Sequence, residues 1–185
     1  MPEISVRGLE MPESPIRKLA PLAAAAKNRG IKVYHLNIGQ PDLPTPQVGL
    51  DALKNIDRTI LEYSPSQGYL SYRQKLVGYY QKYNINVSAD DIIITNGSQQ
   101  VLTMMGACML DPGDKVIVED RTYLVALQSF HFFDPEILPV TINPDGIDCD
   151  ALAAAVAANP DVKFAYVIPN FQNPTGLSYS QQVHD

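Results

Sequence analysis

Short apolar runs alternate with helical segments from Asp90 to the end of the sequence. Unbroken apolar strands, separated by about 10 to 15 residues of helix, are typical of parallel sheets that helices cover on both faces. We therefore predict a three-layer α/β/α fold with a mostly parallel sheet. The expected strands lie at 91–95, 115–119, 136–140 and 163–168, and the expected helices at 98–110, 122–132 and 148–158.

The first 46 residues differ from the rest in composition and in the structure that they predict. An Ala-rich stretch from Pro15 predicts a helix that Gly30 ends, and a short strand is expected at 32–36. Three prolines within 41–46 then predict a rigid, irregular loop. Helical periodicity returns at 47–57 and again at 70–83. The second of these helices has one broad predicted apolar face, made of Leu70, Tyr72, Leu76, Tyr79, Tyr80 and Tyr83.

Composition excludes several classes of function. The 185 residues carry a net charge of −6 and no cluster of Lys or Arg, which argues against nucleic acid or an anionic membrane as the main partner. Two cysteines and three scattered histidines favour neither a disulfide framework nor a metal site. Because no apolar stretch is long enough for a membrane span and no leader is recognised, we expect a cytoplasmic protein.

The first candidate site is the turn Thr95–Gln100, which joins an expected strand to an expected helix. Gly97 lets the backbone approach a ligand closely, and the helix offers free N–H groups and the positive end of its dipole. Ser98 and Gln99 add side-chain donors, so the turn favours phosphate binding. Simple helix capping by Ser98 is the alternative. The glycine patterns of dinucleotide and P-loop sites are absent from the sequence.

A second candidate is the loop 169–176, directly after the expected strand at 163–168. Its two asparagines and two prolines make a rigid loop that can point Asn173 at a ligand. Ordinary structural turns use the same residue types. Since carboxyl ends of parallel strands meet at one edge of a sheet, we expect this loop and the phosphate turn to face one crevice.

Two tyrosines complete the set of candidates. Tyr123 follows the strand at 115–119 and could lie flat on a planar ligand, although packing on the core is the commoner role of an aromatic residue at the start of a helix. Tyr63 lies in a loop before Gly68, where its hydroxyl could reach a phosphate or its ring could line an interface.

Taken in this order, these pieces resemble the class I/II aminotransferases, which are fold-type I pyridoxal-phosphate enzymes. The first part of the chain, to about residue 95, is similar to aspartate-type members, and the remainder to aminoadipate or aromatic-type members. The matching stretches are Asn37–Asp42, the run from Tyr63 to Arg73, Asn96–Gln100, Asp111–Asp114, Tyr123 and Asn173–Gly176.

The resemblance implies roles for individual residues. Gly97–Gln99 would hold the phosphate of pyridoxal 5'-phosphate, Tyr123 would stack on its pyridine ring, and Asn173 would hydrogen-bond its phenolic oxygen. Tyr63 would reach the phosphate of the neighbouring subunit's cofactor, which implies a homodimer. Gly39 would lie near the substrate's α-carboxylate. No metal ion is implied.

The resemblance also implies an activity, the transfer of an amino group from an amino acid to a 2-oxo acid by a ping-pong Schiff-base mechanism. Residues 1–46 would be an N-terminal arm and small-domain segment, and 47–185 the first part of the cofactor-binding large domain. The eight lysines all precede Asn173, and none has the family's Schiff-base context. We therefore expect the chain to be the N-terminal part of a longer enzyme and to be inactive alone.

Three alternatives stay open at this point. A lyase or decarboxylase of the same fold would share the carbanion chemistry. A non-catalytic cofactor-binding module would keep the site without the reaction. A generic nucleotide-binding domain is disfavoured by the missing glycine pattern.

Overall fold

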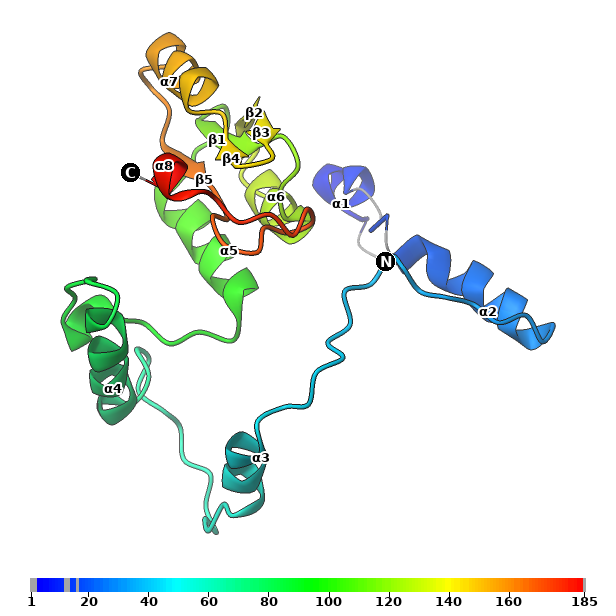
Figure 1. The fold of residues 1–185 in the computed structure, drawn as a ribbon, viewed down its shortest axis with the longest axis vertical. Helices are drawn as coiled ribbons and strands as arrows, with labels where there is room; N and C mark the ends of the chain where they lie inside the picture. The colour runs from blue at the N-terminus through cyan, green and yellow to red at the C-terminus, as the bar shows by residue number, and fades with distance from the viewer. Residues whose placement is uncertain (1–2, 12–13, 16, 185) are drawn as a thin grey trace. The chain divides into compact units, whose positions relative to one another are not determined.

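The computed structural model describes residues 3–11, 14–15 and 17–184 and divides the chain into two compact units, Met1–Glu62 and Tyr63–Asp185. Figure 1 draws the elements of both units. The sequence-based division after residue 46 stays a prediction.

The first unit consists of helices joined by extended chain. Its elements are α1 (Val6–Glu10), the 3-10 turn η1 (Arg17–Leu19), α2 (Ala20–Asn28) and α3 (Gln47–Lys54). The chain leaves α2 at Gly30, which has a φ of +77° and donates its N–H to Lys27 O at 2.9 Å. Both predicted helices are confirmed, but the Ala-rich α-helix begins at Ala20 instead of Pro15 and α3 ends at Lys54 instead of Asp57; α1 was not predicted.

The strand expected at 32–36 is wrong. These residues are assigned no strand, and a β-strand needs a partner to receive its ladder hydrogen bonds. Among the described residues of this unit, no strand is present to provide one. Local apolar pattern alone therefore did not determine structure here.

A three-stranded parallel sheet forms the centre of the second unit. The strands are β1 (Lys115–Glu119), β2 (Glu136–Val140) and β5 (Phe164–Tyr166), in the order β2-β1-β5. Ile117 of β1 pairs with Leu138 on one side and Ala165 on the other. The predicted parallel sheet is confirmed, and β5 is shorter than the expected strand at 163–168.

Helices cover both faces of this sheet. On one face, Val116 and Val118 pack with Leu102 of α5 (Ser98–Met109) and Phe130 of α6 (Leu124–His131). On the other face, Ile117 packs with partly buried residues of α7 (Cys149–Ala158) and α8 (Gln181–His184). Adjacent residues of β1 serve different faces because side chains alternate along a strand. These two clusters of packed residues confirm the predicted layers, and Figure 1 labels the helices that form them.

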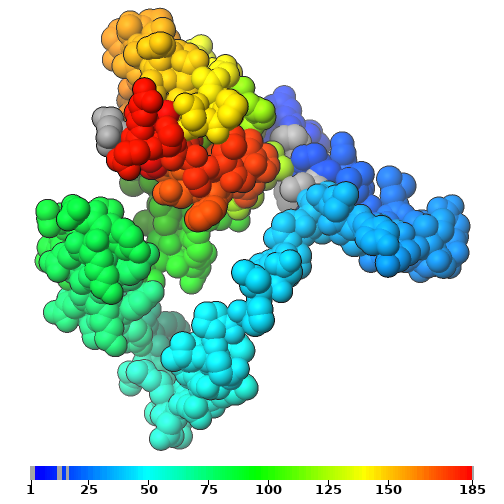
Figure 2. Space-filling view, in the orientation of Figure 1, coloured from blue at the N-terminus to red at the C-terminus, as the bar shows by residue number. Residues whose placement is uncertain are grey.

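A small antiparallel hairpin, which the sequence analysis missed, links β2 to α7. Its strands are β3 (Ile142–Asn143) and β4 (Gly146–Ile147). A Cβ on Gly146 would lie only 2.9 Å from atoms of the Tyr179 and Val183 side chains, so the hairpin packs closely on the C-terminal segment. Ser180 N donates to Asp145 O at 2.8 Å at the same place. Figure 2 shows this orange-to-red segment at the surface of the unit.

Helix α4 (Leu70–Gln81) buries a charged side chain. Tyr72 and Tyr79 are each 51% exposed, whereas Arg73 is 7% exposed. The Arg73 guanidinium donates to Gly68 O at 3.3 Å and to Ala89 O, and it pairs with the Asp90 carboxylate at 3.5 Å. The helix predicted at 70–83 is confirmed with an earlier end; Leu76 and Tyr80 of its apolar face are partly buried, and Arg73 is the residue that the adjoining loops enclose.

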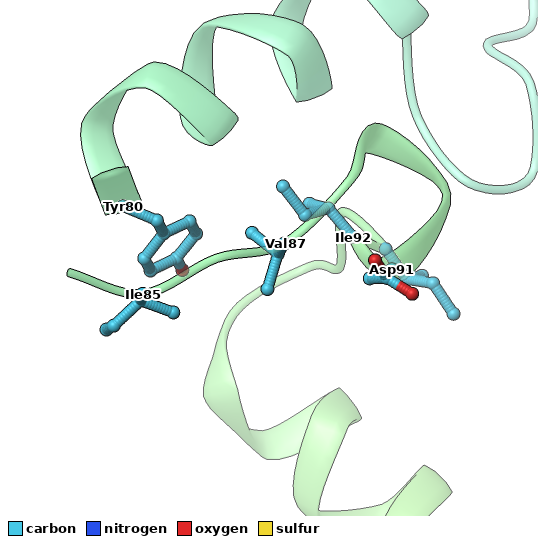
Figure 3. Close-up of a pocket in the computed structure, with 6 residues that line it drawn as sticks. Tyr80, Ile85, Val87, Asp91 and Ile92 are labelled. Carbon is cyan, nitrogen blue, oxygen red and sulfur yellow. The ribbon is translucent and has the colours of Figure 1, made fainter.

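The strand expected at 91–95 is also wrong. Asp91 ends the 3-10 turn η2 (Ala89–Asp91), and the chain then runs extended but unpaired, with Ile94 N donating to Gln67 O at 3.0 Å. Ile92 is buried and Ile93 is 52% exposed. A shallow pocket lies beside this segment and the end of α4 (Figure 3), lined by Tyr80, Ile85, Val87, Asp91, Ile92 and Ile93.

Among the described residues, no helix is both long enough and apolar enough to cross a membrane. Within the same ranges, no three His, Cys, Asp or Glu side chains gather into a possible metal site.

Two helical glycines should respond oppositely to substitution by alanine. Alanine is ordinarily about 0.5–1 kcal/mol better than glycine inside a helix, and a Cβ on Gly78 of α4 would meet nothing within 4 Å. A Cβ on Gly106 of α5 would lie 2.3 Å from the Phe133 ring. We expect Gly78→Ala to raise the free energy of unfolding, and Gly106→Ala to lower it by about 1–3 kcal/mol through overpacking. Urea unfolding of the two variants checks this, and equal shifts of one sign would contradict the packing at Phe133.

Candidate functional site

The amino end of α5 is an open helix terminus. Gly97 is its N-cap, with φ +83° and ψ 171°, and no side chain caps the helix. Ser98 is the first helical residue, so the alternative in which Ser98 serves as the cap is not what the structure has. Both Ser98 and Gln99 are exposed, and a Cβ on Gly97 would meet nothing within 4 Å. The first N–H groups of a helix lack partners within the helix, so they are available here to an anion.

Two local hydrogen bonds shape the turn before this helix. Gln100 Oε1 accepts from Asn96 N at 2.7 Å, and Thr95 Oγ1 donates to Gly97 O at 3.1 Å. The positive φ of Gly97 is a conformation that residues with a Cβ rarely adopt. Glycine at this position therefore permits the bend that leaves the helix end uncovered.

Tyr123 lies where the chain leaves β1 and enters α6. It is the N-cap of α6, it is half-buried, and it packs against the core that contains Phe130. Burial raises the pKa of Tyr166 on β5, and the nearby Tyr123 and Glu119 raise it further. Tyr123 therefore lies near the end of both strands, partly packed on the core and partly accessible.

The loop that follows β5 presents Asn173 to solvent. Asn173 is exposed and its peptide bond to Pro174 is cis. Gly176 N donates to Gln172 O at 2.6 Å, which closes the loop on itself. The loop thus displays Asn173 on a tight turn at the carboxyl end of the sheet.

Gln172, the residue before Asn173, fastens this loop to the end of β1. Its side chain is 1% exposed. Its Nε2 donates to Glu119 Oε2 at 2.8 Å and to Arg121 O. Its Oε1 accepts from Thr175 N at 2.9 Å and from Thr175 Oγ1 at 2.6 Å. The two Nε2 bonds join the loop to the chain that leaves β1, and the two Oε1 bonds close the loop on itself.

Glu119 ends β1 and is itself 1% exposed. Besides Gln172, its carboxylate accepts from Tyr179 Oη at 2.5 Å, from Thr122 Oγ1 at 3.3 Å and from Ile168 N at 3.3 Å. Burial, and then the hydrogen bond to Glu119, raise the pKa of Tyr179 well above its ordinary value. Sequence reasoning missed Glu119, Gln172 and Tyr179. The available signal was an acidic residue at the carboxyl end of a strand whose three central residues are apolar.

The structure brings some of the predicted site residues together and leaves others apart. Tyr123 and the Asn173 loop meet at the carboxyl end of the sheet through Glu119 and Gln172, and α5, which begins at Gly97–Gln99, packs against α6. Tyr63 is fully exposed at the start of the same unit. Gly39 belongs to the first unit, where it is exposed with open space beside it.

Two lysines of the sheet lie away from this edge. Lys115 begins β1 and pairs with Asp161 at 3.1 Å, and Lys163 precedes β5 and pairs with Asp114 at 3.3 Å. Both are at the amino ends of their strands, whereas Glu119 and the Asn173 loop are at the carboxyl ends. Neither lysine is therefore placed to reach a ligand held there.

Comparison with known proteins identifies the family. A family model described as aminotransferase class I and II matches residues 31–182. The chain belongs to this family. It is 31% identical over 192 aligned residues to an aromatic-amino-acid aminotransferase of Thermococcus litoralis, covering 96% of the chain and 44% of that relative. It is 34% identical over 167 residues to a 2-aminoadipate transaminase of Thermus thermophilus, covering 88% of the chain and 40% of that relative.

Solved structures agree with this assignment. An alanine aminotransferase of Pyrococcus furiosus matches with a TM-score of 0.88 at 27% identity, over 98% of this chain and 47% of that one. An aspartate aminotransferase of Thermus thermophilus matches with a TM-score of 0.86 at 26% identity, over 99% and 48%. The chain therefore spans less than half the length of these relatives.

Members of this aminotransferase family use pyridoxal 5'-phosphate, and the residues present fit that group. The open amino end of α5 suits a phosphate, and the accessible part of Tyr123 suits a planar ring. The exposed Asn173 amide offers a hydrogen-bond donor to a ring oxygen. A positive side chain is not required for the phosphate, because the helix supplies N–H donors and a favourable dipole.

The raised pKa of Tyr179 predicts a loss of stability at high pH. Below the ordinary tyrosine pKa of about 10, both the folded and the unfolded chain keep the proton, so the free energy of unfolding does not change with pH through this group. Above it, the unfolded chain releases the proton and the folded chain retains it, so the free energy of unfolding falls as pH rises. Urea unfolding between pH 8 and 11 should show this fall, and Tyr179→Phe should have a smaller slope.

Tyr63→Phe removes a hydroxyl from a fully exposed ring and is the control for the substitution itself. An equal slope in wild type and Tyr179→Phe would contradict the burial of the Tyr179 hydroxyl against Glu119.

Proposed function

We propose that this chain provides the phosphate-binding and ring-binding part of a pyridoxal-phosphate-dependent aminotransferase, which transfers an amino group from an amino acid to a 2-oxo acid in the cytoplasm. The main support is the open amino end of α5, with Gly97 at φ +83°. It lies in the same unit as the strand-end loop that presents Asn173. Every relative named above is an aminotransferase, which favours amino transfer over a lyase or decarboxylase reaction.

The residues of the second unit would divide the binding as follows. The N–H groups and side chains of Gly97–Gln99 would hold the phosphate, and Tyr123 would stack on the ring. Asn173 would donate a hydrogen bond to the phenolic oxygen. When bound, the cofactor supplies an electron sink for the carbanion that forms at the α-carbon of the amino acid. These residues would orient the ring and hold it still, and they move no proton themselves.

Two further roles complete the proposal. The fully exposed hydroxyl of Tyr63 would reach the cofactor phosphate of a second copy in a homodimer. Open space at Gly39 would let its backbone lie against the substrate carboxylate. Both roles derive from the family resemblance, and both need an assembled enzyme.

The phosphate-binding role can be tested by substitution at the start of α5. We expect the double variant Ser98→Ala/Gln99→Ala to bind pyridoxal 5'-phosphate about 10-fold more weakly than wild type, because it removes side-chain hydrogen bonds to a charged group. Equilibrium dialysis with absorbance detection measures the affinity. The matched control Ser66→Ala/Gln74→Ala changes an exposed serine and an exposed glutamine elsewhere in the unit. Equal affinities for both double variants would contradict the site.

The chain as it stands should lack covalent attachment and transamination, because neither sheet lysine reaches the site and no other lysine has the family's context. After incubation with pyridoxal 5'-phosphate and borohydride reduction, mass spectrometry of peptides should find no stoichiometric adduct. A 2-oxo acid assay should find no product above background. A stoichiometric adduct on one specific lysine, or turnover that requires an amino acceptor, would contradict this part of the proposal.

A further inference from the structure

Glu119 is a buried carboxylate whose hydrogen bonds join segments that are distant in sequence. Its two oxygens accept from Thr122 on the way to α6, from Ile168 and Gln172 after β5, and from Tyr179 before α8. A buried charged group is costly unless hydrogen bonds satisfy it. Here four donors satisfy it, so the carboxylate fixes the segments that provide them.

The charge of Glu119 also decides which way the Gln172 amide is turned. An ionised carboxylate only accepts hydrogen bonds, so it must face the NH2 side of the amide. That orientation leaves Gln172 Oε1 free to accept from both the N–H and the hydroxyl of Thr175. If the amide were turned over, its oxygen would face the Glu119 oxygen and the Arg121 carbonyl, and its NH2 would face the Thr175 N–H. Glu119 therefore sets the loop conformation that displays Asn173.

The same carboxylate restrains the segment on which Tyr123 sits. Thr122, the residue before Tyr123, donates its hydroxyl to Glu119 Oε2, the same oxygen that accepts from Gln172. Tyr123 and Asn173, which are proposed to contact the ring, therefore each follow a residue that donates a hydrogen bond to Glu119 Oε2. Tyr179 holds the other oxygen at 2.5 Å and limits rotation of the carboxylate.

We infer that Glu119 is a positioning residue that sets the spacing between Tyr123 and Asn173, and thereby the width of the space that a planar pyridine ring enters. This inference rests on the proposed function for its ligand. The clamp made by Glu119, Gln172 and Thr175 stands on the hydrogen bonds alone.

The clamp is tested on the chain without ligand. Glu119→Gln keeps the size of the side chain but leaves one oxygen where four donors converge. We expect amide hydrogen exchange at Thr175 to become about 10-fold faster, as for the loss of one hydrogen bond to a charged group. Exchange at Ile117 in the centre of the sheet should stay unchanged. The control Asp161→Asn removes an exposed carboxylate near the opposite end of β1 and should leave Thr175 unaffected.

A second experiment compares two ligands, and it separates binding of the ring from binding of the phosphate. Pyridoxal 5'-phosphate should bind about 3- to 10-fold more weakly to Glu119→Gln than to wild type, because the ring contacts lose their fixed spacing. Inorganic phosphate, measured by competition, should bind both proteins equally, because the α5 terminus is unchanged. A general loss of structure would weaken both ligands together, and this result would overturn the positioning role.

A second variant covers the case in which Glu119→Gln does not fold. Tyr179→Phe retains the charge and removes one donor, and we expect a smaller increase in Thr175 exchange and a smaller loss of affinity for pyridoxal 5'-phosphate. Unchanged Thr175 exchange in the folded variants would overturn the inference even if wild type binds the cofactor. Faster Thr175 exchange together with no cofactor binding by wild type would establish the clamp, reject the proposed function and with it the ring-spacing role.

Discussion

The parallel pairing of β1 with a neighbour on each side is the constraint on which the rest of the second unit depends. Because β1 is central, its residues are buried on both faces and its polar backbone is satisfied by β2 and β5. Because the strands are parallel, the chain that follows β1 and the chain that follows β5 leave the sheet at the same edge. The side chain that ends β1 is consequently enclosed by the chain that follows β1 and by the chain that follows β5. A charge placed there must gather donors from both.

This arrangement explains why the site is assembled from groups of different character. The phosphate end needs only an uncovered helix terminus, which one glycine permits. The ring-binding part needs side chains at a set distance from each other. This distance depends on hydrogen bonds between segments that are far apart in the sequence, such as Glu119 and Gln172, which are 53 residues apart. The first requirement is local in sequence and the second is not.

The difference also decides what could be predicted. The strands at 115–119 and 136–140 were predicted with the observed bounds because each is a mostly apolar run that has a parallel partner; β1 is buried in the sheet, and β2 at its edge is only partly buried. The run at 91–95 has the same appearance but is unpaired, since strand formation depends on a neighbour that local pattern does not reveal. The helix expected at 70–83 is found at Leu70–Gln81, where the adjoining loops enclose Arg73 while Tyr72 and Tyr79 stay half exposed. Glu119 and Gln172 were not predicted because their role depends on a hydrogen bond between residues that are far apart in the sequence. The Asn173 loop and the Gly97 turn, by contrast, are recognised from a few consecutive residues.

The contact between the β3–β4 hairpin and the C-terminal segment has a consequence for how this edge tolerates sequence change. Gly146 leaves room for Tyr179 and Val183, and Asp145 O holds Ser180 N. The hairpin therefore supports Tyr179, whose hydroxyl donates a hydrogen bond to Glu119. A bulkier residue in this turn would alter the ring-binding loop from behind without touching any ligand. Although the β3–β4 turn and the loop 169–176 are separated in the sequence, they are coupled through this packing. We expect their amino-acid sequences to vary together among relatives.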